Sequence, residues 1–293
     1  MSEAFHLIIH SLTDSLKLLP FLFLAYLLME YLEHHSGELA KKVLGGSGRF
    51  GAVVGSALGL IPQCGFSSAA AGLYSAGVVS IGTLIAVFLS TSDEMVPIFL
   101  SHKVPVSLLF KILALKFAVA LLFGIVIDLV IKYINRKKSR ESESKIEEFC
   151  EREDCHCHTG IVKPALIHTL KVGFFVFLFT LVLNVLIHIV GEDSIAMMIT
   201  GNPLLASILS AIVGLIPNCA SSVIISELYI SGVLSSGALM AGLLANSGVA
   251  LAVLFRTNRP RKNTLAIVGI LLIISLLTGM LVDITPLSQF LSI

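Results

Sequence analysis

The sequence predicts an all-α polytopic membrane protein of two inverted five-segment repeats whose helices are broken near the bilayer midplane. Hydrophobic residues make up 56% of the 293 residues and charged residues 13%, against roughly 25% charged residues in soluble domains. Of the 20 basic and 19 acidic residues, 15 lie in residues 132–163. The composition excludes a water-soluble globule, and a repeat described below divides the chain into halves.

Five stretches each predict one spanning helix, since about 20 mostly apolar residues cross a bilayer. They are Leu18–Leu32, Val106–Ile131, Val172–Val190, Val233–Phe255 and Thr264–Val282.

Two longer uncharged tracts do not fit one helix each. Phe50–Ser92 is interrupted at Pro62, and Ser194–Ser226 is interrupted at Pro203 and Pro217. Proline removes a backbone donor and clashes with the preceding turn, but it is favoured at the first position of a helix. We therefore expect short helices that meet within the bilayer, with Pro62 and Pro217 opening half-helices whose positive dipole ends point inward.

The two halves of the chain are related in sequence. A shift of 155 residues aligns Gly59–Lys103 with Gly214–Asn258 without a gap, with 16 identities in 45 positions. The matched pairs include Pro62/Pro217, Cys64/Cys219, Tyr74/Tyr229, Gly77/Gly232, Ser92/Ser247, Gly124/Gly279 and Asp128/Asp283. The pattern predicts a first membrane repeat over residues 1–131, a charged linker over 132–163 and a second repeat over 164–293.

Basic residues collect after the first helix, in the linker and before the last helix. The positive-inside rule places these three connections in the cytoplasm. The two halves must then insert into the inner membrane in opposite orientations, with both termini on its extracytoplasmic side. Inverted repeats with broken helices at matching positions are typical of secondary transporters, whose site lies at the repeat interface.

Each break carries polar side chains. Backbone groups freed in lipid cost several kcal/mol each unless protein or cavity water satisfies them, so we expect the breaks to line an interior site. A proline kink satisfied by neighbouring Ser and Gly is the alternative. The candidate substrate-binding residues of the breaks are Gln63, Cys64, Ser67, Ser68, Asn218, Cys219, Ser221 and Ser222.

Acidic residues lie in different places in the two halves. Asp93 and Glu94 lie in the fourth segment and match Gly248 and Val249, whereas Glu227 replaces Gly72. An intramembrane carboxylate marks an ion path by default. Oxygen ligands suit Mn²⁺ or Mg²⁺, and thiols favour softer ions. We expect a transported metal at Asp93, Glu94, Cys64, Cys219 and Glu227, with Asn246 nearby; alternatively the acids only pair with Lys111 or Lys116.

The sign of the substrate stays open at this point. Inward half-helix N-termini favour an anion, whereas the carboxylates favour a cation, and protons on Asp93 or Glu94 would reconcile the two. Proton coupling is therefore a hypothesis, with an oxyanion or organic-solute carrier as the alternative. An intramembrane enzyme with Cys64 or Cys219 as nucleophile is a third reading. Walker A and common hydrolase motifs do not occur in the sequence, so we expect no enzyme.

The linker contains a cluster of thiols and imidazoles. Alternating Cys and His bind soft or borderline metals, so the cluster predicts a metal-capturing loop, with a solvated connector as the alternative. Its residues are Cys150, Cys155, His156, Cys157 and His158. No tightly bound cofactor is expected. With a net charge of +1, neither is a nucleic-acid partner, and the sequence leaves the oligomeric state open.

The strings IPQCGFSS, IPNCASS and STSDE, together with the Cys/His-bearing central loop, resemble those of the prokaryotic ten-helix heavy-metal exporters, variously labelled arsenic efflux proteins or manganese transporters. The resemblance runs over nearly the whole chain. It implies a permease of the cytoplasmic membrane with ten helices in two five-helix halves, which exports a metal or metalloid. It carries over Pro62, Pro217, Gln63, Cys64, Asn218, Cys219 and the Asp93–Glu94 pair.

Overall fold

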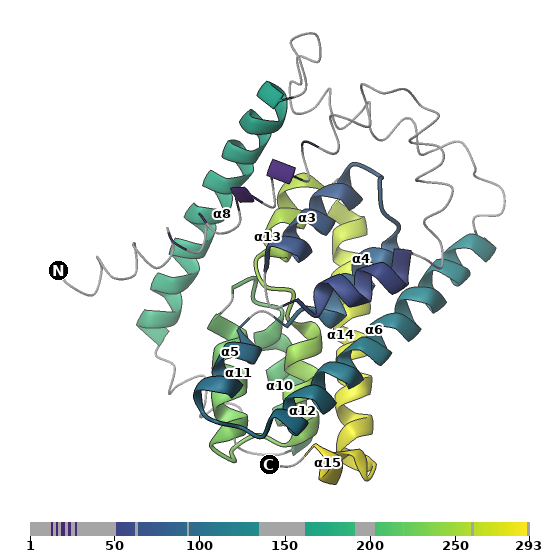
Figure 1. The fold of residues 1–293 in the computed structure, drawn as a ribbon, viewed down its shortest axis with the longest axis vertical. Helices are drawn as coiled ribbons and strands as arrows, with labels where there is room; N and C mark the ends of the chain where they lie inside the picture. Colours follow the sequence, from purple (N-terminus) through teal and green to yellow (C-terminus); the bar gives the residue numbers. More distant parts are fainter. Residues whose placement is uncertain are drawn as a thin grey trace.

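The computed structural model describes residues 51–61, 64–92, 94–134, 162–190, 203–218, 220–258 and 261–291, with seven positions between 13 and 27. Helices and their connecting turns make up this described part (Figure 1). After a helical segment over 51–59, the helices are α3 (Cys64–Ser75), α4 (Ile81–Ser90), α5 (Met95–Ser101), α6 (Val106–Ile134), α8 (Val162–Val190), α10 (Pro203–Gly214), α11 (Ala220–Ile230), α12 (Ser236–Ala245), α13 (Ala250–Thr257), α14 (Arg261–Ile284) and α15 (Leu287–Phe290).

Within the described residues, four helical stretches are long and apolar enough to cross a membrane. They are Ile81–Ser101, Val106–Tyr133, Ser236–Thr257 and Arg261–Ile284. The outer helices expose large apolar side chains, such as Phe110 and Leu122 on α6. A soluble protein would bury such residues, whereas a lipid-facing surface favours them. The predicted all-α membrane architecture is confirmed.

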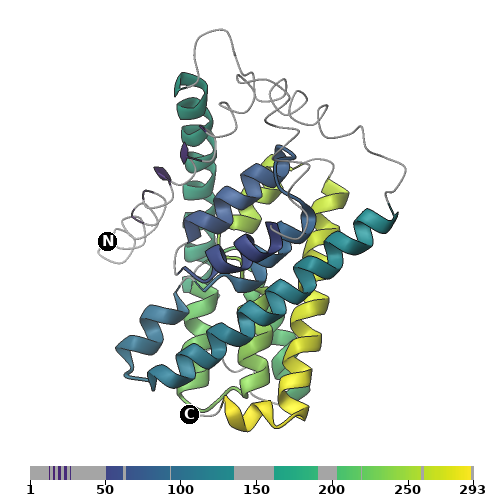
Figure 2. The same ribbon diagram turned by 45° about the vertical axis from the view of Figure 1, so that its right-hand side comes forward.

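The centre of the molecule is formed by α4 and α12. All ten residues of α12 are buried, as are nine of the ten in α4. Helix α6 packs on α4, and α14 packs on α12. Figure 2 shows α6 running obliquely along the molecule, so that its outer face remains open.

The packing of α4 on α6 is reproduced by α12 on α14, residue for residue. Asp128 of α6 accepts hydrogen bonds from the Gly82 amide at 2.9 Å and the Ser80 hydroxyl at 2.8 Å. Asp283 of α14 accepts the equivalent bonds from the Gly237 amide at 2.8 Å and the Ser235 hydroxyl at 2.9 Å.

Ser80 and Ser235 also cap α4 and α12 by accepting from backbone amides three residues on. Each carboxylate therefore fixes the start of a central helix, where negative charge is favoured. Every residue in this arrangement obeys the shift of 155 found in the sequence.

The predicted proline breaks are confirmed as interruptions, but Pro217 does not open the next helix, and Pro62 lies outside the described residues. The first helical segment ends at Gly59 and α3 begins at Cys64. Helix α10 ends at Gly214, Pro217 lies in a bend, and α11 begins only at Ala220. Proline at the first helical position occurs instead at Pro203, the start of α10.

The prediction of one helix over Val233–Phe255 is wrong, because α12 ends at Ala245 and α13 begins at Ala250. The Asn246 side chain accepts a hydrogen bond from the Gly248 amide at 2.9 Å, and Gly248 has φ +56°. An Asx turn followed by a left-handed glycine offers the backbone an alternative to the helix. The matching segment of the first half is also interrupted, between α4 and α5.

The remaining predicted helices are longer than expected. Helix α6 extends to Ile134, and α8 begins at Val162, ten residues before its predicted start. Helix α14 covers Arg261–Ile284. The seven described positions between residues 13 and 27 are helical, and the rest of the first predicted helix lies outside the described residues.

Candidate transport site at the helix breaks

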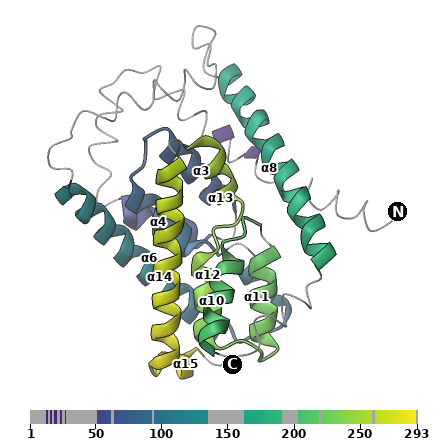
Figure 3. The same cartoon turned by 180° about the vertical axis from the view of Figure 1, so that it is seen from behind.

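Four helix interruptions lie at mid-height in the molecule, two from each half. Figures 1 and 3 show α3 and α13 together in the upper part, and α5, α11, α10 and α12 in the lower part. The interruptions are the links from residue 59 to α3, α4 to α5, α10 to α11 and α12 to α13. Helix ends leave backbone N–H and C=O groups without intrahelical partners, so polar backbone collects at this level.

Each half supplies the packing partner of the other half. Helix α3 packs on α13, where the hydroxyls of Ser75 and Thr257 are 2.7 Å apart. Helix α5 packs on α11, where the rings of Phe99 and Tyr229 stack with centroids 6.1 Å apart. The helix that follows a break in one half is therefore held by a helix that follows a break in the other.

The structure buries most of the predicted polar residues that it describes. The buried side chains at or directly after the breaks are Ser67, Ser68, Asn218, Ser221, Ser222 and Asn246. They are joined by Thr91, Ser92 and Ser247, which had not been predicted as ligands. Burying hydroxyl and amide groups costs free energy unless they are hydrogen-bonded. The number of such groups here therefore favours a polar interior at the breaks over an apolar one.

The amide side chains shape the breaks. Oδ1 of Asn218 accepts from the Ala220 amide at 3.4 Å, and the Ser221 hydroxyl donates to the Asn218 carbonyl at 2.7 Å. Asn246 makes the corresponding turn before α13. The two asparagines predicted as ligands thus also hold the backbone at the starts of α11 and α13.

The acidic candidates are not all brought to the buried centre. Glu94 lies directly before α5 and is partly buried. Glu227 is exposed on α11, one turn before its end at Ile230. A carboxylate facing acyl chains is costly, so Glu227 belongs to an aqueous or interfacial surface.

Several predicted residues lie outside the described part of the chain. These are Gln63, Asp93, Cys219 and, in the linker, Cys150, Cys155, His156, Cys157 and His158, and for Cys64 only the backbone is described, as the first residue of α3. Among the residues that the structure describes, no group of three or more His, Cys, Asp or Glu side chains could hold a metal ion.

Lys116 is the functional candidate that the sequence analysis missed, because it considered this lysine only as a packing partner of the acids. Its side chain is fully buried in α6. The ammonium group donates to the carbonyl oxygen of Thr91 and, at 3.0 Å, to that of Leu243. These carbonyls belong to the ends of α4 and α12. A lysine in the apolar middle of this 29-residue helix was the available signal.

The chain matches a known protein family. The sequence pattern of the family described as "Putative, 10TM heavy-metal exporter" matches residues 3–183 and 161–292. The chain belongs to this exporter family. No curated protein and no solved structure matches it.

Membership of the exporter family agrees with the architecture. It makes the chain a multi-pass membrane protein of a transporter family, and the described structure contains long apolar helices together with paired short ones. The short helices α10 and α11 each have only 12 and 11 residues, too few to cross a bilayer singly.

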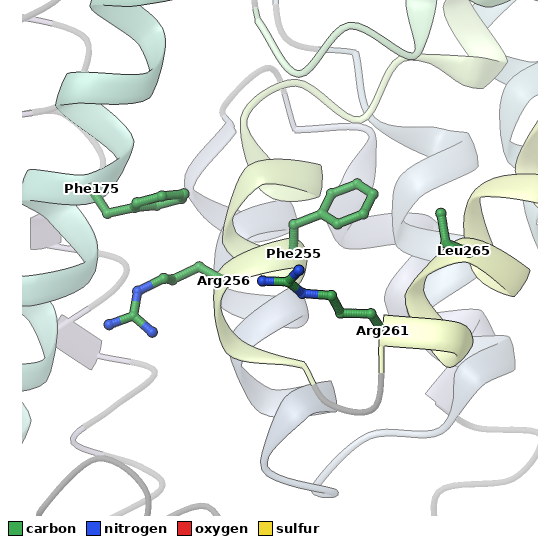
Figure 4. Close-up of a pocket in the computed structure, with 5 residues that line it drawn as sticks. All are labelled: Phe175, Phe255, Arg256, Arg261 and Leu265. Atoms are coloured by element: carbon green, nitrogen blue, oxygen red, sulfur yellow. The ribbon is translucent and has the colours of Figure 1, made fainter.

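A cavity of about 380 Å³ lies apart from the breaks, between α8, α13 and α14. Its lining residues are Phe175, Phe255, Arg256, Arg261 and Leu265. Figure 4 shows the Arg256 guanidinium extending to the side of α13 on which Phe175 of α8 lies, while the Arg261 side chain extends from α14 towards α13. The chemistry of this cavity is cationic and aromatic, and it contains none of the predicted transport residues.

Proposed function

We propose that this member of the exporter family is a proton-coupled secondary transporter that exports a divalent or heavy metal ion such as manganese, or a metalloid. Its two halves insert with opposite polarity and rock about a site at the helix breaks. The linker lies in the cytoplasm, and both termini lie on the extracytoplasmic side of the inner membrane. Family membership supports export of a metal, and the positions of the basic residues support the orientation.

The observation that carries the proposal is the meeting of interrupted helices from both halves around buried polar groups. Within the described residues, four buried hydroxyls have no hydrogen-bond partner: Ser68, Ser210, Ser226 and Ser247. Ser68 lies in α3 after one break, and Ser247 lies within another. Unpaired buried hydroxyls are rare in proteins, so water or a substrate is the natural partner for them.

The packing also supports alternating access. Asp128 joins α6 to α4, and Asp283 joins α14 to α12. Each of these hydrogen-bonded contacts, called a latch from here on, lies within one half. By contrast, α3–α13 and α5–α11 contacts join one half to the other. Rocking of rigid halves would loosen one of these two interfaces at a time, which opens the breaks to one side of the membrane and then to the other.

The proposed ligands are oxygen-rich. Asp93 and Glu94 would supply charge, and Asn246 and the serine hydroxyls would complete the coordination, with Cys64 and Cys219 adding softer ligands. A metal binds only to deprotonated carboxylates and thiolates, so binding releases protons. Protons that reload these groups after metal release provide the coupling for export.

A resistance assay tests this function. Cells lacking the gene are supplied with the wild-type chain, with the double variant Asp93→Asn and Glu94→Gln, or with Glu227→Gln as the control. We expect the double variant to reach the membrane but to lose resistance to Mn²⁺ or Zn²⁺, while the exposed Glu227 tolerates the change. Full resistance in the double variant would remove the cation site.

A second candidate is an oxyanion carrier. The observation in its favour is the fully buried Lys116, because a buried ammonium group attracts anions. Transport of ⁵⁴Mn²⁺ into inverted vesicles, measured with arsenite, arsenate or succinate as competitors, separates the two. Competition by an anion, with no Mn²⁺ uptake above the empty-vector control, would favour the anion carrier.

A further inference from the structure

Lys116 occupies a position where a metal cation would be expected. Its ammonium binds one carbonyl from each half, Thr91 of α4 and Leu243 of α12. Thr91 is the residue that caps the end of α4, and Leu243 lies in the last turn of α12. These are the orphan carbonyls of two helix C-termini. The negative ends of two helix dipoles therefore converge on one buried positive charge.

The lysine is not required by the packing of the repeat. The shift of 155 places Leu271 of α14 at the equivalent position, and Leu271 is also fully buried. An apolar side chain fills that place in the second half. The amine is thus an asymmetric addition to a framework whose Asp128 and Asp283 contacts and helix caps are matched, and a charge in the bilayer interior marks a functional site by default.

We propose that the Lys116 ammonium is a built-in substitute for the transported cation. It rests on the Thr91 and Leu243 carbonyls when the metal site is empty and moves off them when the metal ion binds. In the empty carrier, the ammonium balances the one carboxylate that no proton has reloaded, so the unloaded carrier has no excess charge and can return across the membrane. This inference rests on the proposed function and adds the means by which the empty carrier resets.

The proposal predicts that the loss of Lys116 affects net export but not metal-for-metal exchange. Net export needs the empty carrier to return, whereas metal-for-metal exchange uses only the loaded carrier. Replacing Lys116 with Met removes the charge and keeps an unbranched side chain of similar length. We expect Lys116→Met to lower net ⁵⁴Mn²⁺ transport about a hundredfold, the penalty of an uncompensated charge within the bilayer. Exchange should stay within about twofold, since the bound metal supplies the charge.

The experiment uses the purified full chain in liposomes. Net transport is measured with metal on one side only, and exchange with unlabelled Mn²⁺ on both sides. Leu271→Met is the matched control and should leave both modes unchanged. Lys116→Gln, which keeps hydrogen-bond donors without charge, guards against misfolding of the Met variant and should show the same selective loss.

The outcomes distinguish the claims. Equal loss of net transport and exchange in folded Lys116→Gln would overturn the substitute-cation role, and so would wild-type rates in both modes. Absence of both modes in the wild-type chain would instead overturn the proposed metal transport itself.

The cavity between α8, α13 and α14 supports a second, independent inference. Arg256 lies in the last turn of α13, and Arg261 is the first residue of α14. Both line the same cavity with the rings of Phe175 and Phe255. Guanidinium groups bind phosphate oxygens in bidentate fashion. Basic pockets between spanning helices bind lipid headgroups, and the apolar walls suit the adjoining acyl chains.

We infer that this cavity binds the headgroup of an anionic phospholipid. A phosphodiester would lie between Arg256 and Arg261, with its glycerol and first methylenes against Phe255 and Leu265. Phosphate alone would gain nothing from these apolar walls, which is why the lipid is the favoured source of the anion.

Thermal unfolding of the purified chain in neutral detergent tests the inference. Phosphatidylglycerol, phosphatidylcholine or inorganic phosphate is added to the wild type, to Arg256→Gln with Arg261→Gln, and to Lys262→Gln as a neighbouring control. We expect phosphatidylglycerol to stabilise the wild type and Lys262→Gln but not the double variant. Equal stabilisation of the double variant, or of the wild type by phosphatidylcholine or phosphate, would overturn the assignment.

Discussion

Replacing Gly82 with Ala tests the repeated latch between a central helix and its outer neighbour. A Cβ at Gly82 would overlap the carbonyl oxygen of Gly124 and the carboxyl group of Asp128. Backbone on one side and a fixed carboxylate on the other leave no flexible neighbour to move aside. Gly237 has the same surroundings in the second half, against Gly279 and Asp283, so Gly237→Ala should behave alike.

The size of the effect follows from the latch geometry. Restoring van der Waals distance requires α4 and α6 to separate by about 1 Å. The Gly82 and Ser80 hydrogen bonds to Asp128, at 2.9 and 2.8 Å, would then exceed hydrogen-bonding distance. Each bond to a charged acceptor contributes about 1.5 kcal/mol or more. We therefore expect a loss of about 3 kcal/mol, or a Tm lower by about 6 °C or more.

The assay is thermal unfolding of the purified chain in detergent, followed by size-exclusion chromatography of the heated samples. Gly269→Ala in α14 is the control, because a Cβ there meets no atom within 4 Å. It should be neutral or slightly stabilising, since alanine favours a helix over glycine. Tm values of Gly82→Ala and Gly237→Ala equal to that of the control would refute the close packing of α4 and α12 on their neighbours.

Three further outcomes are expected. Ser80→Ala and Ser235→Ala each remove the cap of a central helix and should each cost about 1 kcal/mol, measured by Tm; a large difference between them would contradict the matched geometry. A double-mutant cycle of Ser75→Ala and Thr257→Val should give a coupling of about 1 kcal/mol, and zero coupling would argue against their 2.7 Å contact. Crosslinking cysteines placed at those two positions should lock α3 to α13 and stop transport, and unchanged transport would contradict movement at this interface.

The sequence alone predicted the membrane-spanning helices and the repeat. Helix α6, α14 and the interruptions near Pro62 and Pro217 follow from apolar length and proline chemistry. These signals are local, since each depends on residues adjacent in the chain. The family resemblance rested on the same strings at the breaks and is confirmed over nearly the whole chain.

The sequence analysis missed the second interruption of each half. The apolar stretch Val233–Phe255 satisfies the length criterion for one helix, and only the Asn246–Gly248 turn shows that it is two. Asn and Gly each cost a helix about 1 kcal/mol or less, which an apolar run of this length can absorb, so the packing of α13 on α3 contributes to the outcome. Of the candidate residues, the burial of Asn218 and Asn246 agrees with an interior site, while the exposure of Glu227 does not.

The sequence by itself determined that the chain is a multi-pass membrane protein and that its two halves are related, because hydrophobic length and internal repetition can be read directly along the chain. Only the tertiary structure decided which ends meet. The place of Lys116 on carbonyls from α4 and α12, 25 and 127 residues away, depends on two helix ends brought together by packing. Such a convergence of backbone groups has no residue type of its own and therefore leaves no pattern in the sequence.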